Sequence, residues 1–182
     1  DRVQVNGGID TVNLGAGRDI LTINYAHSST NVTGGVATGD HSAGYDGLVS
    51  DLGGNSVSFL GGENFVITTG HGDDNIVTGD GHDILNGRDG DDVLSGGGGR
   101  DLISGGVGHD TLTGGRGGDV MTGGDGGGDT FIFTRLDDSK ATAMDLITDL
   151  QASDTLDVSA IDADTGTAGN QAFTLVGAFD GH

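Results

Sequence analysis

Residues 70–123 read GHGDDNIVT GDGHDILNG RDGDDVLSG GGGRDLISG GVGHDTLTG GRGGDVMTG, which is one nine-residue unit repeated six times. Each unit contains one aspartate in the same phase: Asp74, Asp83, Asp92, Asp101, Asp110 and Asp119. A large apolar residue follows each of these aspartates by two positions: Ile76, Leu85, Leu94, Ile103, Leu112 and Met121. In register, the unit is G-G-x-G-x-D-x-U-x, where U is apolar.

This unit predicts an all-β fold. Its x-U-x part suits a short extended strand, and its G-G-x-G-x-D part must turn the chain, because glycine tolerates the positive φ angles of tight turns. Two strands and two turns, or two units, close one coil. Successive coils then stack as parallel strands about 4.8 Å apart. We therefore expect a parallel β-roll.

The repeats resemble the RTX nonapeptide repeats of secreted, hemolysin-type bacterial proteins. The resemblance rests on the units quoted above and, in degenerate form, on residues 1–22, where Asp1, Asp10 and Asp19 keep the nine-residue phase. It implies a right-handed parallel β-roll loaded with several calcium ions. It also implies an extracellular, bacterial location and export by the type I secretion machinery.

The spacing itself favours calcium. Aspartates two units apart come to lie one above the other, so that one edge of the stack carries Asp74, Asp92 and Asp110 and the other carries Asp83, Asp101 and Asp119. An ion between two such loops would reach oxygens on both at about 2.3–2.6 Å, the calcium range, whereas magnesium prefers about 2.0–2.1 Å. Carbonyls bared by the glycine turns can complete an all-oxygen shell, and no sulfur ligand for zinc or copper is present.

The expected metal ligands follow from this phase. They are the six aspartates of the repeated units, together with Asp129, Asp1, Asp10 and Asp19. The loop glycines of the same sites are Gly72, Gly81, Gly90, Gly99, Gly108 and Gly117. Stacking on both edges predicts at least four ions. Three histidines in the same loops lack paired acids and are interpreted as exposed loop residues: His71, His82 and His109.

The composition agrees with ligation and excludes several partners. The chain has 28 acidic residues, of which Glu63 alone is a glutamate, against 7 basic ones, for a net charge of −21. The short aspartate side chain can fold back into its own loop. Such charge repels nucleic acids and anionic membranes. A disordered acidic linker would share this composition, but the strict phase argues against it.

A conventional hydrophobic core cannot supply the stability of this chain. The chain of 182 residues has 39 glycines, no proline and no cysteine, so no disulfide can stabilise it. Ordering the glycine-rich coils costs more free energy than burying one apolar residue per unit returns. We therefore expect the rolls to be largely unfolded without calcium and to fold as it binds. No run of 18 apolar residues is present, so no membrane span is expected.

The phase divides the chain into four parts. Residues 1–22 form a short N-terminal roll, and residues 69–132 form the main roll, in which an extra residue delays Asp129 by one position. Residues 23–68 lose the phase and are predicted to be a strand-rich insertion, with strands at 56–60 and 64–68. Because Asp1 enters at the sixth position of a unit, we interpret the sequence as a piece of a longer polypeptide.

Residues 133–182 are predicted to cap the roll, since a stack of coils leaves its last coil exposed. Strands are expected at 130–133, 145–150, 154–158 and 172–176. Through the segments DTFIF, DLITDL, DTLDVSAIDA and GNQAFTLVGAF, this region resembles the C-terminal region of serralysin-type metalloproteases. No HExxH motif is present, so the protease activity is not carried over, and no enzyme is expected in these residues.

Two functions remain open at the level of sequence. The first is a calcium-responsive module that is unfolded in the cytosol, passes through an exporter, and folds outside the cell to stabilise the C-terminal part of an extracellular protein. The second is a structural module that self-associates in a surface layer, adhesin or filament, because the open end of a roll is an unpaired strand edge.

Overall fold

The computed structural model describes residues 1–40, 44–135, 138 and 142–161, and every regular element in these ranges is a β-strand. The strands are β1 (Arg2–Val5), β2 (Ile9–Asn13), β3 (Ile20–Asn24), β4 (Val32–Asp40), β5 (Gly44–Asp51), β6 (Ser56–Gly62), β7 (Asn64–Thr68), β8 (Asn75–Val77), β9 (Asp80–Gly81), β10 (Ile84–Asp89), β11 (Val93–Gly99), β12 (Leu102–Gly108), β13 (Thr111–Gly117), β14 (Val120–Gly126), β15 (Thr130–Ile132), β16 (Leu146–Ile147) and β17 (Thr155–Asp157). No membrane-crossing helix is present in the described ranges.

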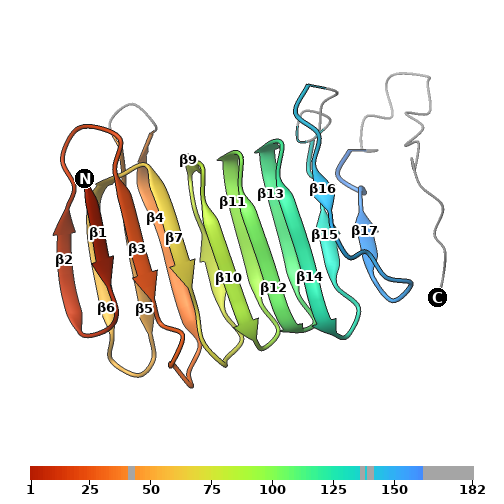
Figure 1. Ribbon diagram of the computed structural model, residues 1–182, viewed down its shortest axis with the longest axis horizontal. Helices are drawn as coiled ribbons and strands as arrows, with labels where there is room; N and C mark the ends of the chain where they lie inside the picture. Colours follow the sequence, from red (N-terminus) through yellow and green to blue (C-terminus); the bar gives the residue numbers. More distant parts are fainter. Residues whose placement is uncertain (41–43, 136–137, 139–141, 162–182) are drawn as a thin grey trace.

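The strands form two sheets. The seven-stranded sheet has the order β1-β3-β7-β10-β12-β14-β16. The ten-stranded sheet has the order β17-β15-β13-β11-β8-β4-β5-β6-β2, with β9 beside β11. Figure 1 shows these strands side by side along the long axis, from the red N-terminal end to the blue strands β16 and β17.

Pairing in the repeated units is parallel and advances by one coil at a time. Ile84 lies beside Leu102, which lies beside Val120, and Leu94 lies beside Leu112 in the other sheet. The offset is the two-unit period of the sequence, so the predicted all-β parallel roll is confirmed. Pairing also continues from the apolar position into the glycines, as at Gly97 and Gly115, so the strands are longer than the x-U-x segment alone predicts.

The core is a column of single side chains along the inside of each sheet. The U residue of every unit in the main roll is at most 1% exposed: Ile76, Leu85, Leu94, Ile103, Leu112 and Met121. Phe131 is fully buried at the next rung of the ten-stranded sheet, beside Leu112. The N-terminal coils add a second column in the seven-stranded sheet, where Phe65 and Ile67 are both buried. Every coil thus contributes little apolar area, in agreement with the sequence.

Residues 23–68 belong to the same two sheets as the rolls. Strand β7 lies between β3 and β10 and is parallel to both, and β4 pairs in parallel with β8. Only β5 departs from the pattern, because it is antiparallel to β4 and to β6. The strands expected at 56–60 and 64–68 are confirmed as β6 and β7. The segment thus continues the stack between the two rolls.

The C-terminal strands cover the last coils of the main roll. Strand β15 pairs with β13, β17 pairs with β15, and β16 pairs with β14, all in parallel. Three of the four strands expected here are confirmed, each shorter than predicted. The fourth, at 172–176, lies outside the described residues.

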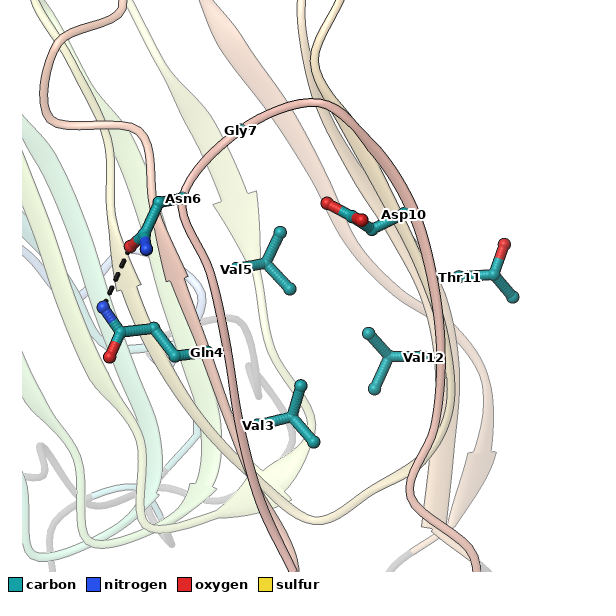
Figure 2. A pocket seen from close by; sticks show the side chains of 8 residues that line it. All are labelled: Val3, Gln4, Val5, Asn6, Gly7, Asp10, Thr11 and Val12. Atoms are coloured by element: carbon teal, nitrogen blue, oxygen red, sulfur yellow. Dashed lines mark hydrogen bonds between the residues drawn. The ribbon is translucent and has the colours of Figure 1, made fainter.

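A shallow depression of about 540 Å³ lies between β1 and β2, and Figure 2 shows Val3, Val5 and Val12 directed into it, with Asp10 above them. Gln4 and Asn6 point away from it and share a hydrogen bond of 2.9 Å. Val5 and Val12 are nevertheless buried, at 7% and 8% exposure.

Candidate metal centre

The aspartates of the main roll form two continuous series of hydrogen bonds, which we call the carboxylate ladders. In each ladder, one carboxylate oxygen, Oδ1, accepts the backbone N–H of the residue aligned with it one coil earlier. In the ten-stranded sheet the bonds run from Val32 to Asp74, Asp74 to Asp92, Asp92 to Asp110, Asp110 to Asp129 and Asp129 to Asp154, at 2.6–3.0 Å. In the seven-stranded sheet they run from Phe65 to Asp83, Asp83 to Asp101, Asp101 to Asp119 and Asp119 to Asp145, at 2.8–2.9 Å.

The ladder aspartates are buried. Their exposed fractions are 0–2% from Asp74 to Asp129. The backbone bonds account for only one oxygen of each carboxylate. The second oxygen, Oδ2, is buried with no hydrogen-bond partner in the described residues at Asp83, Asp92, Asp101, Asp110 and Asp119. A buried carboxylate in this condition is costly unless a cation or a proton compensates its charge.

The protein itself supplies little compensating charge. Within the described residues, the ion pairs are those of the N-terminal amine with Asp19 and of His71 with Asp89. Neither of them involves a ladder aspartate of the main roll. The ladders are thus two rows of buried acids without a paired side-chain cation in the described part of the chain.

The pKa values of these acids show the consequence. Burial raises the pKa of Asp92 and of Asp101 to about 8, although the backbone N–H bond opposes the rise. Neighbouring ladder carboxylates add to it, as Asp74 and Asp110 do for Asp92. Burial likewise raises the pKa of Asp145 to about 7 and those of Asp83 and Asp110 to about 6. Without a cation, the ladders therefore hold protons close to neutral pH.

From Gly87 onward, the glycine at the first position of each unit makes room for the second oxygen. A β-carbon at Gly87 would overlap Asp92 Oδ2 and would lie 2.7 Å from the carbonyl oxygen of Gly105, one coil further on. The same overlap with the carboxylate of the unit's own aspartate occurs at Gly96, Gly105, Gly114 and Gly123. In these loops the second carboxylate oxygen therefore lies directly against the glycine, and the carbonyl oxygen of Gly105 also lies close to Gly87.

This donor set fits calcium. The oxygens are carboxylate and backbone carbonyl, the hard ligands that calcium takes in flexible numbers, and neither sulfur nor imidazole is among them. In the described residues no cluster of three or more His, Asp or Glu side chains is placed to hold a metal. Two carboxylates from adjacent coils together with carbonyls would therefore hold each ion, and its charge would compensate the buried acids.

The structure separates the predicted ligands into groups. Seven of the predicted ligands lie in the ladders: Asp74, Asp83, Asp92, Asp101, Asp110, Asp119 and Asp129. Asp19 is 1% exposed and belongs to a shorter series, in which the amine of Asp1 donates to Asp19 and the Asp19 N–H donates to Glu63 Oε2 at 2.8 Å. Asp10 lies on β2 beside Val57 and joins neither ladder. The side chain of Asp1 is exposed.

The predicted loop glycines lie where backbones meet closely. The carbonyl oxygen of Gly81 faces Gly99 and that of Gly99 faces Gly117, and a β-carbon on the later glycine of either pair would overlap it. Gly72, Gly90 and Gly108 are related in the same way in the other edge. These glycines place the coils close together, and their carbonyl oxygens line the junction between loops.

The nine-residue pattern did not predict three acidic residues of these hydrogen-bond series. Asp145 and Asp154 end the two ladders, although the nine-residue phase is lost before them. Glu63 occupies the aligned position in the N-terminal series. Each stands one residue before a short strand, which is the signal that could have identified them. The three histidines are exposed, as predicted. The expectation that they lack paired acids is wrong for His71, which contacts Asp89 Oδ2 at 2.7 Å across one coil. His82 Nδ1 accepts the Arg100 N–H at 2.9 Å.

Comparison with known families agrees with this geometry. The model of the RTX calcium-binding nonapeptide repeat matches residues 1–22, 68–103 and 95–129, in four copies. The chain carries RTX calcium-binding repeats. A search of curated proteins found no match.

The RTX repeats coincide with the ladder-bearing coils. The matched residues include the aspartates from Asp74 to Asp129 and, in the first segment, Asp19. RTX repeats are structural calcium-binding units, so the matched coils form a calcium-binding module, and the buried acids lie within these coils. The C-terminal strands β16 and β17 lie outside the matched residues and extend both ladders by one rung.

Proposed function

We propose that this chain is a calcium-binding RTX module that folds as calcium binds, after type I secretion of the protein that carries it. The observation that supports this proposal is that, among the described residues, the buried Oδ2 atoms of Asp83, Asp92, Asp101, Asp110 and Asp119 have no hydrogen-bond partner. Folding without metal must either protonate these acids or bury their charge. Binding of calcium removes both costs and so couples folding to the ion.

The coupling suits export. In the low calcium of a cytosol, the acidic chain would stay unfolded and could thread a narrow exporter. Millimolar calcium outside the cell would then fold it, in an extracellular location. The folded roll would stabilise the C-terminal part of the extracellular protein, a placement suggested by the sequence resemblance of residues 133–182 to serralysin-type C-terminal regions.

A calcium titration followed by far-ultraviolet circular dichroism tests the coupling. We expect a cooperative rise of β-structure with calcium, reversed by a chelator, and little rise with magnesium at the same concentration, because the carboxylate and carbonyl set suits the larger ion. Full β-structure in metal-free buffer at pH 8 would contradict the proposal.

A second function, self-association in an extracellular assembly, is favoured by one feature of the surface. On the outer face of the seven-stranded sheet, successive coils align a column of apolar residues: Val66, Ile84, Leu102, Val120 and Leu146. Ile84, Leu102 and Leu146 are 42%, 47% and 56% exposed. The matching column of the other sheet is mostly polar, with Asn75, Thr111 and Thr130 beside Val93.

Light scattering during the same titration separates the two functions. Constant monomer mass supports the folding module alone. If mass grows with calcium, Leu102→Thr should reduce the growth, and Val93→Thr, a matched change of a residue 44% exposed on the other sheet, should not. Growth that is equal in both variants would exclude the apolar column as the contact.

A further inference from the structure

The first two units of the main roll differ from the later ones at one position. Thr69 and Thr78 occupy the first position of the unit, where the following units have glycine. Both side chains are buried, at 1% and 5% exposure. The Thr69 hydroxyl donates to the carbonyl oxygen of Gly87 at 2.7 Å, and the Thr78 hydroxyl donates to that of Gly96 at 2.8 Å. Each bond therefore joins one loop to the loop one coil further on.

In the later loops, the position that the threonine side chain would take is occupied by the second carboxylate oxygen of the unit's own aspartate. A β-carbon at Gly87 would overlap Asp92 Oδ2 and would lie 2.7 Å from the carbonyl oxygen of Gly105. Thr69 faces the carbonyl oxygen of Gly87 one coil further on, and Gly87 faces the carbonyl oxygen of Gly105 in the same way. The Thr69 side chain thus lies at the first junction in the place that Asp92 Oδ2 takes at the second.

We propose that the hydroxyls of Thr69 and Thr78 replace calcium ions at the first two junctions of the main roll. These junctions join residues 69–74 to 87–92 and residues 78–83 to 96–101. The inference rests on the proposed calcium binding and specifies which junctions of the main roll hold no ion. A hydroxyl proton directed at the carbonyl oxygen takes up one of the acceptor sites that an ion would use.

The surroundings of Asp74 support the exchange. Its two carboxylate oxygens accept the N–H of Val32 at 2.6 Å and that of Gly70 at 3.2 Å, so neither lacks a partner. At Asp92, one coil later and beside Gly87, Oδ2 has none in the described residues. At Asp83, beside Thr78, Oδ2 has no hydrogen bond in the part of the chain that the structure describes, and the Thr78 side chain opposes the rise that burial causes in the pKa of this carboxyl group.

The consequence is a roll that begins without metal. The pairs Asp74/Asp92 and Asp83/Asp101 would hold no ion, and calcium would occupy the junctions that start from Gly87 onward. The coils up to the Thr78 junction are joined by side-chain and backbone bonds alone. They would offer a formed end on which the calcium-dependent coils assemble.

Native mass spectrometry of the full chain in calcium tests this by counting bound ions. Thr69→Gly and Thr78→Gly should each bind one ion more than the wild type, because each removes the hydroxyl from a carbonyl oxygen that could then bind an ion together with the aspartate Oδ2. Thr69→Ser keeps the hydroxyl and should leave the count unchanged. Thr113→Gly, a change at a partly exposed strand position, controls for the effect of adding a glycine.

The reverse variant guards against a loop that fails to fold. Gly87→Thr should bind one ion fewer than the wild type, since it copies the Thr69 arrangement one coil later. Equal counts in the wild type, both Thr→Gly variants and Gly87→Thr would overturn the inference while leaving calcium binding intact. A wild type that binds no calcium would instead overturn the proposed function.

Discussion

At the scale of the residue, each ladder aspartate has two separate tasks. Oδ1 accepts a backbone N–H from the previous coil, and Oδ2 carries charge into the junction between loops. At Asp101, the first task is a 2.9 Å bond from the Asp83 N–H, and the second is an oxygen with no hydrogen-bond partner in the described residues. Substitutions can therefore separate the structural bond from the ionic contact.

Asp101→Asn should lose calcium binding while retaining much of the metal-free stability. The amide keeps an oxygen for the Asp83 N–H but removes the charge, so we expect the calcium midpoint to rise about tenfold or more. Asp101→Ala should in addition lose about 1–3 kcal/mol, because it leaves a buried N–H unsatisfied. Calorimetric titration and urea unfolding measure the two effects. Asp125→Asn, at an exposed position, is the control, and equal losses in all three variants would contradict the division of tasks.

The pH dependence of the metal-free chain follows from the same acids. In the fold, burial raises the pKa of Asp92 and Asp101 from 3.8 to about 8. The folded state therefore binds protons more tightly than the unfolded chain, and stability must fall as the pH rises from about 4 to about 8. We expect circular dichroism in metal-free buffer to show more β-structure at pH 5 than at pH 8. Saturating calcium should flatten this dependence, and a metal-free fold that gains stability toward pH 8 would contradict it.

At the scale of the element, the unit of construction is the loop that joins two strands of a coil. Its glycines serve two purposes that the sequence does not distinguish. Some, such as Gly54 with φ +98°, only allow a left-handed turn in open space. Others, such as Gly99 with φ +131°, also lie directly against the carbonyl oxygen of the preceding coil.

Gly99→Ala should destabilise the calcium-loaded protein more than Gly54→Ala. Both changes place a side chain at positive φ, which costs about 1–2 kcal/mol. Only at Gly99 does the new methyl group overlap the Gly81 carbonyl, which adds about 1–3 kcal/mol of overpacking. Thermal unfolding in saturating calcium would show the difference, and equal shifts of Tm would mean that the coils separate without cost.

At the scale of the whole molecule, the described coils form one stack. After the last repeated coil, β15 places Phe131 beside Leu112 and β16 places Ile147 beside Met121. The last repeated coil is thus covered by strands that are not themselves regular repeats, as solenoid folds require.

Ending the chain at Asp129 should therefore impair the main roll. Without β15, β16 and β17, Leu112 and Met121 lose the residues beside them, and we expect either a less cooperative calcium transition or calcium-dependent association. Circular dichroism with light scattering measures both. A chain that ends at Ile161 keeps all three strands and serves as the control. If the shorter chain folds as a monomer with an unchanged calcium midpoint, the capping role is wrong.

The nine-residue period was sufficient to predict an all-β roll with parallel stacking. It also grouped the six aspartates of the repeated units, because a constant period fixes which residues meet one coil apart. Where the period is lost, the alignment of the strands could be found only from the folded structure. Asp145 and Asp154 join the ladders across offsets of 26 and 25 residues, and β5 enters antiparallel. Strand pairing sets those alignments through hydrogen bonds between distant segments. The Thr69 bond to Gly87 was equally hidden, since a substitution in one unit gains its partner only when the next coil lies beside it.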